Sequence, residues 1–166
     1  MLPESELLDY LRNVSLFKDI ENIPEALLKL ADKLKSCDFK PGDSIITEGE
    51  TGSELYLLMT GQASVYKSTA VGDQYKVAIL HASNYVFFGE GGLLDSDSRS
   101  ATIKADIRCT CLILARSAID EFGKEHPQWA LPILLRIART VMERLRKTNN
   151  DLLLIYNALV SEIRGQ

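Results

Sequence analysis

The sequence has few of the residues that build metal, disulfide and catalytic sites. Its 166 residues include two histidines, His81 and His126, and three cysteines, Cys37, Cys109 and Cys111. The histidines stand apart from each other, and the odd set of cysteines lacks the spacing of a zinc site or a disulfide framework. No Ser–His or Cys–His pair lies in a catalytic motif. We therefore expect a protein that is not an enzyme and carries no cofactor or metal.

Long apolar runs and an excess of positive charge are also missing. The longest apolar stretches, such as residues 152–156, are far shorter than the roughly 20 residues that cross a bilayer. There are 19 Lys and Arg residues against 23 Asp and Glu residues, a net charge of -4, which argues against binding nucleic acid over the whole surface. No charged and then apolar leader opens the sequence. These absences predict a cytoplasmic protein with reduced cysteines and no membrane insertion.

The patterns along the chain are helical, then β, then helical again. Apolar residues at helical spacing predict two short helices within residues 7–34. From Phe39 the period changes to two, and glycine turns such as Pro41–Asp43 separate short strand candidates. After Arg116 the helical period returns, with Ser117 as the expected N-cap. Many short strands at close spacing predict one domain built on a β-barrel or sandwich.

The last helical region carries a heptad pattern. Its apolar seam steps alternately by three and four residues, with Thr148 as the one polar member: Leu131, Leu134, Ala138, Val141, Leu145, Thr148, Leu152, Ile155 and Leu159. A 3.5-residue period held over four heptads favours a homodimer through this helix. The alternative is a single helix packed on its own barrel, broken at Asn149–Asp151. The basic residues of the region are interpreted as a solvated face: Arg136, Arg139, Arg144, Arg146 and Lys147.

The most informative stretch is Phe87–Thr102. It holds a carboxylate, a guanidinium and three glycines: Glu90, Arg99, Gly89, Gly91 and Gly92. The glycines permit close approach of the backbone, and a short helical turn there would direct amide N–H groups at an anion. A carboxylate can accept from a sugar hydroxyl while a guanidinium binds phosphate oxygens, so the stretch suits a nucleotide. A plain Glu–Arg ion pair closing a surface loop is the alternative.

This run resembles the phosphate-binding cassette of cyclic-nucleotide-binding domains, the sensing module of catabolite-activator regulators, kinase regulatory subunits and nucleotide-gated channels. Upstream, Phe39–Asp43, Glu48–Gly52, Glu54–Tyr56 and Gly61 match that family's glycine turns in order and spacing. The resemblance covers residues 7–148. It implies an α+β fold, an eight-stranded antiparallel β-roll of jelly-roll type, with flanking N-terminal helices and a long C-terminal helix.

The resemblance also implies roles for individual residues. Glu90 is expected to bind the ribose 2′-hydroxyl and Arg99 the cyclic phosphate, while the backbone of Gly89–Gly92, with Ser100 and Ala101, completes the phosphate cradle. The position of Ser100 is compatible with either purine, and we favour cyclic AMP over cyclic GMP. Three leucines of the last helix are candidates for capping the base: Leu131, Leu134 and Leu135.

Two functional hypotheses follow. In the first, residues 1–148 form a cyclic-nucleotide sensor that signals through the C-terminal helix, including the extension 149–166, to a dimer partner or a protein effector. The second is a ligand-independent dimerisation module, suggested by Gly91 and by the missing glycine ahead of Phe88. The presence of both charged cassette residues favours the sensor. No helix-turn-helix pattern follows Asn150, which argues against direct DNA binding.

Overall fold

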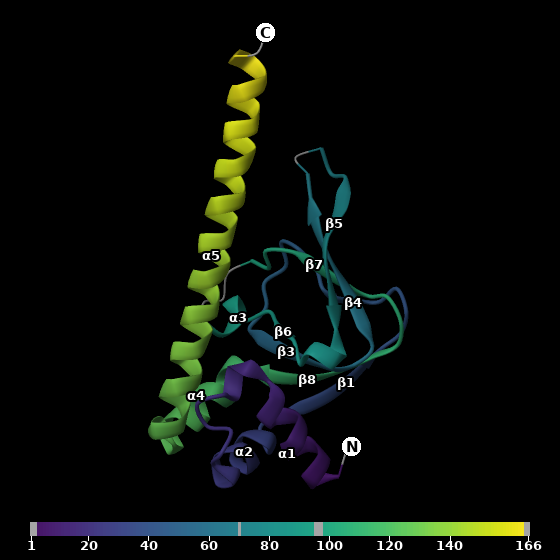
Figure 1. Cartoon of the computed structure of the whole chain (residues 1–166). Coiled ribbons are helices and arrows are strands. Elements are labelled where there is room, and N and C mark those ends of the chain that lie inside the picture. Colours follow the sequence, from purple (N-terminus) through teal and green to yellow (C-terminus); the bar gives the residue numbers. More distant parts are fainter. Residues whose placement is uncertain (1–2, 70, 95–97, 165–166) are drawn as a thin grey trace.

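The computed structural model describes residues 3–69, 71–94 and 98–164. Within these ranges, helices at both ends enclose eight strands (Figure 1). The helices are α1 (Glu4–Asn13), η1 (Ser15–Phe17), α2 (Pro24–Ala31), η2 (Ala82–Asn84), α3 (Gly91–Leu94), α4 (Arg116–Glu125) and α5 (Pro127–Arg164). The strands are β1 (Lys35–Phe39), β2 (Ser44–Ile46), β3 (Glu54–Thr60), β4 (Gln62–Ser68), β5 (Gln74–His81), β6 (Phe87–Phe88), β7 (Thr102–Ala105) and β8 (Cys109–Ala115).

The strands form two antiparallel sheets of four. One sheet has the order β1-β8-β3-β6 and the other β2-β7-β4-β5. The predicted period of two is seen in part in β7, where Ile103 and Ala105 are buried on either side of the half-buried Lys104, while the polar Thr102 is buried as well. Ile107, which continues the same pattern in the sequence, lies beyond the end of β7 and is 54% exposed. The predicted α+β fold with an eight-stranded β-roll is therefore confirmed.

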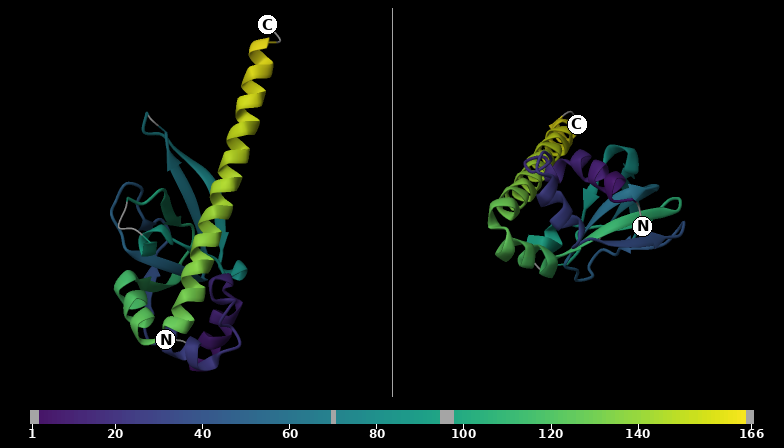
Figure 2. Two further views of the ribbon diagram at one scale, coloured as in Figure 1. Left: turned by 90° about the vertical axis from the view of Figure 1, so that its left-hand side faces the viewer. Right: turned by 90° about the horizontal axis from the view of Figure 1, so that it is seen from below.

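Two apolar clusters hold the roll together. The inner cluster lies between the two sheets and contains Ile46, Leu58, Phe88, Ile103 and Cys111, among others. The outer cluster lies between the first sheet and the helices, and it includes Leu11, Phe17, Leu27, Leu57, Phe122 and Ile137. Helices from both ends of the chain thus cover the same sheet, as both views in Figure 2 show. This arrangement brings α5 past the side of the roll.

Helix α4 begins differently from the sequence prediction. Its first residue is Arg116 and its N-cap is Ala115, which makes no side-chain capping hydrogen bond. The predicted cap Ser117 is wrong, because it is already the second residue of the helix. The amide of Arg116 donates to the carbonyl of Ser53 at 2.9 Å as β8 ends, and this contact fixes the start of the helix two residues earlier than predicted.

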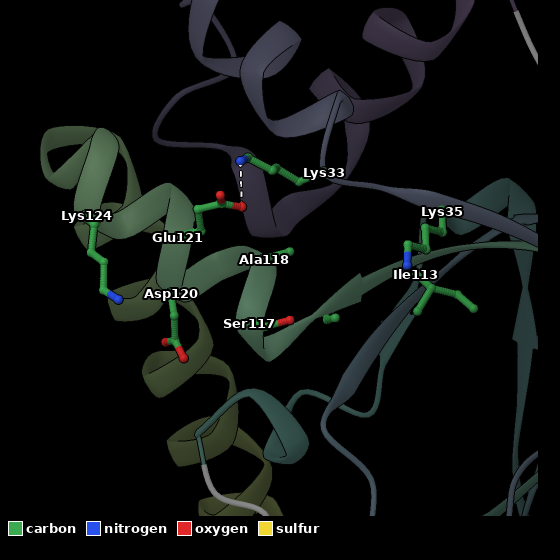
Figure 3. Close-up of a pocket in the computed structure, with 9 residues that line it drawn as sticks. Lys33, Lys35, Ile113, Ser117, Ala118, Asp120, Glu121 and Lys124 are labelled. Carbon is green, nitrogen blue, oxygen red and sulfur yellow. Dashed lines mark hydrogen bonds and ion pairs between the residues drawn. The ribbon is translucent and has the colours of Figure 1, made fainter.

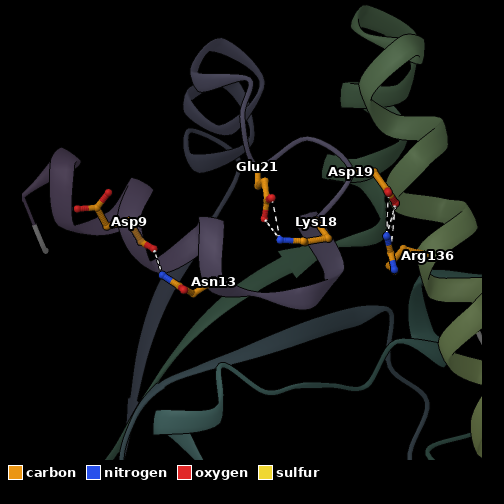
Figure 4. A network of polar contacts seen from close by, with 6 residues as sticks. All are labelled: Asp9, Asn13, Lys18, Asp19, Glu21 and Arg136. Carbon is orange, nitrogen blue, oxygen red and sulfur yellow. Dashed lines mark hydrogen bonds and ion pairs between the residues drawn. The ribbon is translucent and has the colours of Figure 1, made fainter.

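An ion pair anchors the first half of α5 to the N-terminal connector. Arg136 donates from Nε and Nη2 to both carboxylate oxygens of Asp19, with a shortest distance of 2.8 Å (Figure 4). Three apolar residues of the same segment are buried against the roll: Ala130, Ile133 and Ile137. The packed stripe therefore differs from the predicted heptad seam.

Helix α5 continues without a break through Asn149–Asp151, where the sequence left an interruption open. Its second half extends away from the roll (Figures 1 and 2). Most seam residues are exposed in this single chain, including Leu131 at 59%, Leu145 at 50% and Leu152 at 63%. The interpretation that the whole seam packs on the chain's own barrel is therefore wrong.

Candidate ligand-binding site

Arg99 is buried inside the cassette, which we define as residues 88–101. Only 9% of the residue is exposed. Its Nη1 donates to the carbonyl of Gly89 at 3.0 Å, and its Nη2 donates to the carboxylate of Glu54 at 3.1 Å. The guanidinium also lies 5.9 Å from the centre of the Tyr56 ring. Because a guanidinium cannot lose its proton in a protein, this buried charge is permanent.

Backbone contacts hold Arg99 in this position. Its amide donates to the carbonyl of Glu50 at 2.8 Å, and its carbonyl accepts from the amide of Gly49 at 2.9 Å. An isolated bridge between Thr51 and Ser98 continues the same pairing. The 49–51 turn therefore fixes the backbone on either side of Arg99 and leaves its side chain pointing into the roll.

Strand β3 supplies the side chains that meet the guanidinium. Glu54 and Tyr56 lie two residues apart, so the pleat places them on the same face of the strand. The ring of Tyr56 stacks on Phe88 of β6, with centres 5.5 Å apart. Burial raises the pKa of Tyr56 above its ordinary value, so its hydroxyl stays protonated near neutral pH.

Two glycines make room for the guanidinium. A Cβ atom at Gly52 would lie 2.5 Å from both Nε and Nη2 of Arg99. A Cβ at Gly92 would lie 2.8 Å from Nη1 and 2.5 Å from the carbonyl oxygen of Gly52. Any side chain at either position would displace Arg99 or the backbone, which explains why close approach requires glycine at these two places.

Glu90 is the second buried charge of the cassette. Only 6% of the residue is exposed, and Arg144 of α5 donates a hydrogen bond to its carboxylate. Among the described contacts, Glu90 therefore pairs with α5 while Arg99 pairs with Glu54. The alternative of a Glu90–Arg99 ion pair closing a surface loop is thus wrong.

The other predicted cassette residues surround these two charges. Gly89 accepts from Arg99, and Gly91 opens α3, where a Cβ atom would meet open space. Ser100 is exposed, and its carbonyl accepts from Nζ of Lys67. Ala101 is half-buried just before β7. The middle of the cassette, residues 95–97, lies outside the described residues.

A third acidic residue, Glu48, connects β4 to the segment that leads into the 49–51 turn. The carboxylate of Glu48 accepts from the amide of Ser68 at 2.8 Å and pairs with Lys67 at 3.4 Å. The hydrogen bonds from Ser68 and the charge of Lys67 lower the pKa of Glu48 below its ordinary value. Lys67 thus joins Glu48 to the carbonyl of Ser100 at the end of the cassette.

Sequence reasoning missed three residues of the site. Glu54 and Tyr56 were within a matched segment, and strand alternation was the signal that places both on one face. Arg144 was interpreted as part of a solvated basic face; its side chain is indeed 56% exposed, but the ion pair with Glu90 was not foreseen, and Arg136 likewise pairs with Asp19. The base-capping candidates Leu131–Leu135 lie about 13 Å or more along α5 from Arg144, at about 1.5 Å per residue. Arg144, which contacts Glu90, therefore lies well beyond them along the helix.

Other parts of the described structure offer no comparable constellation. A hollow of about 520 Å³ lies between β1 and α4 (Figure 3), and at its rim Lys33 pairs with Glu121 at 2.8 Å. In residues 3–69, 71–94 and 98–164 there is no group of three His, Cys, Asp or Glu side chains placed to hold a metal ion. None of the helices described has the length and apolar content needed to cross a membrane.

Comparisons with known proteins agree with this geometry. A family model described as "Cyclic nucleotide-binding domain" matches residues 37–126. The chain is 35% identical over 109 residues to the cAMP-dependent protein kinase regulatory subunit of Blastocladiella emersonii, a match that covers 66% of this chain and 26% of that protein. It is 38% identical over 116 residues to cGMP-dependent protein kinase 2 of Homo sapiens, covering 68% and 15% respectively.

Solved structures show the same architecture. The catabolite activator protein of Thermus thermophilus superposes with a TM-score of 0.74 at 25% identity, over 85% of this chain and 62% of that one. The present chain thus spans only part of each of these relatives. The family match covers more than half of the chain, and it includes Glu54, Glu90 and Arg99. The chain therefore belongs to the family of cyclic-nucleotide-binding domains.

Proposed function

We propose that this chain is a sensor that binds a cyclic nucleotide, cyclic AMP in preference to cyclic GMP, and signals through α5. Arg99 binds the cyclic phosphate and Glu90 accepts from the ribose 2′-hydroxyl. The backbone of Gly89–Gly92, with Ser100 and Ala101, completes the phosphate cradle. The chain acts as a regulatory module rather than an enzyme, and its ligand is the nucleotide alone.

The observation that carries this proposal is the pair of buried opposite charges on one short loop. Arg99 and Glu90 lie on either side of α3, and each is matched by a side-chain partner from outside the cassette. Burying such charges is costly, and the sites that retain them usually use them for recognition. A cyclic nucleotide offers an anion for one and a hydroxyl donor for the other.

The contact between Glu90 and Arg144 supports a route for the signal. A ribose hydroxyl that donates to Glu90 competes with the Arg144 guanidinium for the same buried carboxylate. Binding then releases α5 from the cassette at this point. The exchange of this half-exposed ion pair is worth about 0.5–1 kcal/mol, which supplies part of the roughly 1–3 kcal/mol typical of allosteric coupling.

The exposed seam supports a homodimer as the receiver of that signal. Seam residues from Leu145 to Leu159 lie on the part of α5 that extends from the roll, and their apolar side chains are exposed to solvent in the single chain. Exposed apolar rows of this length are characteristic of interaction surfaces. The second partner that we propose is a protein effector that binds the dimer. Direct contact with DNA is not part of the proposal.

The choice between cyclic AMP and cyclic GMP is a separate part of the proposal. The two kinase relatives include one protein named for each nucleotide. Ser100 offers a short hydroxyl next to Arg99, which suits either purine. We favour cyclic AMP because the longer hydroxyl side chain that often accompanies guanine recognition in this family is absent at position 100.

Isothermal titration calorimetry with cyclic AMP and cyclic GMP tests the proposal. The parent should bind, and Arg99→Ala should weaken binding by about 10- to 100-fold, as expected for loss of a charged hydrogen bond. Arg108→Ala is the matched control, because Arg108 is exposed and pairs with Asp38. It should bind as the parent does. Absence of heat with either nucleotide at millimolar concentration would contradict the sensor and leave the ligand-independent dimerisation module.

A further inference from the structure

Glu54 forms an ion pair with the guanidinium of Arg99, the group that the proposed ligand would bind. Its Oε2 lies 3.1 Å from Nη2 of Arg99. The same oxygen accepts from the amide of Ser53 at 3.0 Å, and Oε1 lies 3.5 Å from the Ser53 hydroxyl. Because Ser53 also holds the carboxylate, Glu54 stays beside the phosphate position when Arg99 turns to a ligand.

Glu54 differs in this respect from the other acidic residues of the cassette region. Glu90 is balanced by Arg144, and Glu48 is balanced by Lys67 and the amide of Ser68. The cation that balances Glu54 is Arg99 itself. A phosphate bound to Arg99 therefore removes the counter-charge of Glu54 and meets its negative charge within a few ångströms.

The resulting repulsion depends on the charge of the ligand. The Glu54 side chain is 38% exposed and that of Arg99 only 8%, so solvent screens the interaction incompletely. A cyclic phosphodiester carries one negative charge, whereas a phosphate monoester carries about 1.5 to 2 at neutral pH. Glu54 consequently penalises a phosphate monoester more than a cyclic phosphodiester.

We propose that Glu54 is a specificity-determining residue that makes this site favour a singly charged cyclic phosphodiester over doubly charged nucleoside monophosphates. The inference rests on the proposed function and extends it, because a sensor of cyclic nucleotides must distinguish them from the monophosphates that share their base and sugar. Cyclic and open-chain phosphates both carry oxygens that the Arg99 guanidinium can bind, so the charge of Glu54 is what separates them at this point of the site.

Competition binding on the full chain tests the role of Glu54. Cyclic AMP and 5′-AMP each displace a fluorescent cyclic AMP analogue, and the ratio of their inhibition constants measures selectivity. In Glu54→Gln the ratio should fall by about threefold or more, the size of a half-exposed charge interaction. Glu54→Ala should lower the ratio in the same direction. Glu25→Gln removes the same charge and should leave the ratio unchanged, because that side chain is exposed on α2, outside the site.

The outcomes separate this inference from the proposed function. If the parent binds cyclic AMP and 5′-AMP competes no better against either Glu54 variant than against the parent, the inference is overturned while the sensor stands. If the ratio falls equally in Glu25→Gln, the effect is one of net charge and the inference is also overturned. If the parent binds no cyclic nucleotide, the proposed function fails. Thermal unfolding of each variant checks that the proteins used in the binding assay are folded.

Discussion

Arg144 of α5 donates a hydrogen bond to the carboxylate of Glu90 in the cassette, across 54 residues of sequence. The side chain of Arg144 is 56% exposed, whereas that of Glu90 is 8% exposed. The contact is therefore asymmetric. Water can hydrogen-bond to Arg144 when Glu90 is not available, whereas few donors other than Arg144 or a ligand can reach Glu90. This asymmetry makes the carboxylate the point at which ligand and helix compete.

The first prediction concerns this competition. Arg144→Ala should raise the affinity for cyclic AMP by about two- to fivefold, because an exposed ion pair contributes about 0.5–1 kcal/mol that the ligand no longer has to displace. The affinity for 2′-deoxy cyclic AMP should change little, because that ligand has no hydroxyl to offer Glu90. Calorimetric titration of both ligands measures the difference.

Arg146→Ala is the control for removing a positive charge from the same stretch of α5. Arg146 is exposed, and among the described residues it forms no ion pair with the cassette, so its loss should affect neither ligand. An equal gain for cyclic AMP and its 2′-deoxy form in Arg144→Ala would show that Arg144 acts through the general field of the helix and not through Glu90.

The fold was predictable because its signals are local. The alternation at Ile103 and Ala105 reflects the pleat of one strand, and the glycine turns mark where neighbouring strands end. The start of α4 was not predictable from capping residues, because a distant carbonyl at Ser53 holds the amide of Arg116. A contact between segments that are far apart in sequence outweighed the local preference of Ser117.

The residues of the site likewise fall into those with local sequence signals and those that depend on contacts between distant segments. Glu90, Arg99 and Gly89–Gly92 lie within one run, and the resemblance of that run to a known cassette assigned them to one site, whereas Gly52 lies outside it. Arg144 depends on the direction in which α5 leaves α4, and that direction is set by the burial of Ala130, Ile133 and Ile137. Sequence periodicity indicated the seam of α5 but not the angle of the helix, so it assigned Arg144 to solvent.

The second prediction concerns the cysteines. Cys109 and Cys111 are fully buried, while Cys37 is partly exposed. Burial raises the pKa of Cys111 to about 12 and that of Cys109 above its ordinary value, which suppresses the reactive thiolate form. In the native chain, a thiol reagent at mildly alkaline pH should modify Cys37 rapidly and the two others only on unfolding. Cys37→Ser should abolish the rapid phase, and uniform reaction of all three thiols would contradict the prediction.

The third prediction concerns the attachment of α1 to the roll. The buried hydroxyl of Tyr10 donates to the carbonyl of Leu58 at 3.0 Å. Burial raises the pKa of Tyr10 above its ordinary value, so the donor proton is retained. Tyr10→Phe should lower the free energy of unfolding by about 1–2 kcal/mol, because the carbonyl loses a buried partner.

Chemical denaturation measures this loss, and Tyr75→Phe provides the comparison. Tyr75 is 52% exposed on β5, so removing its hydroxyl should change the free energy of unfolding by less than about 0.5 kcal/mol. Equal losses in the two variants would mean that the Tyr10 hydroxyl contributes nothing beyond an exposed one.

The fourth prediction concerns the seam of α5. Leu152 and Ile155 belong to the predicted seam and are 63% and 67% exposed in the single chain. If a second α5 covers them, Leu152→Asp places a charge in that interface and should convert the dimer to a monomer, because an unpaired buried charge is strongly unfavourable. Sedimentation velocity at micromolar concentration distinguishes the two masses.

Leu154→Asp is the control that gives this experiment its meaning. Leu154 is 68% exposed, as open as Leu152, but two residues along an α-helix correspond to a rotation of about 200°, which places it on the opposite side. A seam interface therefore predicts that Leu154→Asp remains dimeric while Leu152→Asp does not. If both substitutions disrupt the dimer, the second half of α5 is enclosed on several sides, as in a bundle, and the two-stranded arrangement is wrong. If neither does, the dimer forms through another surface.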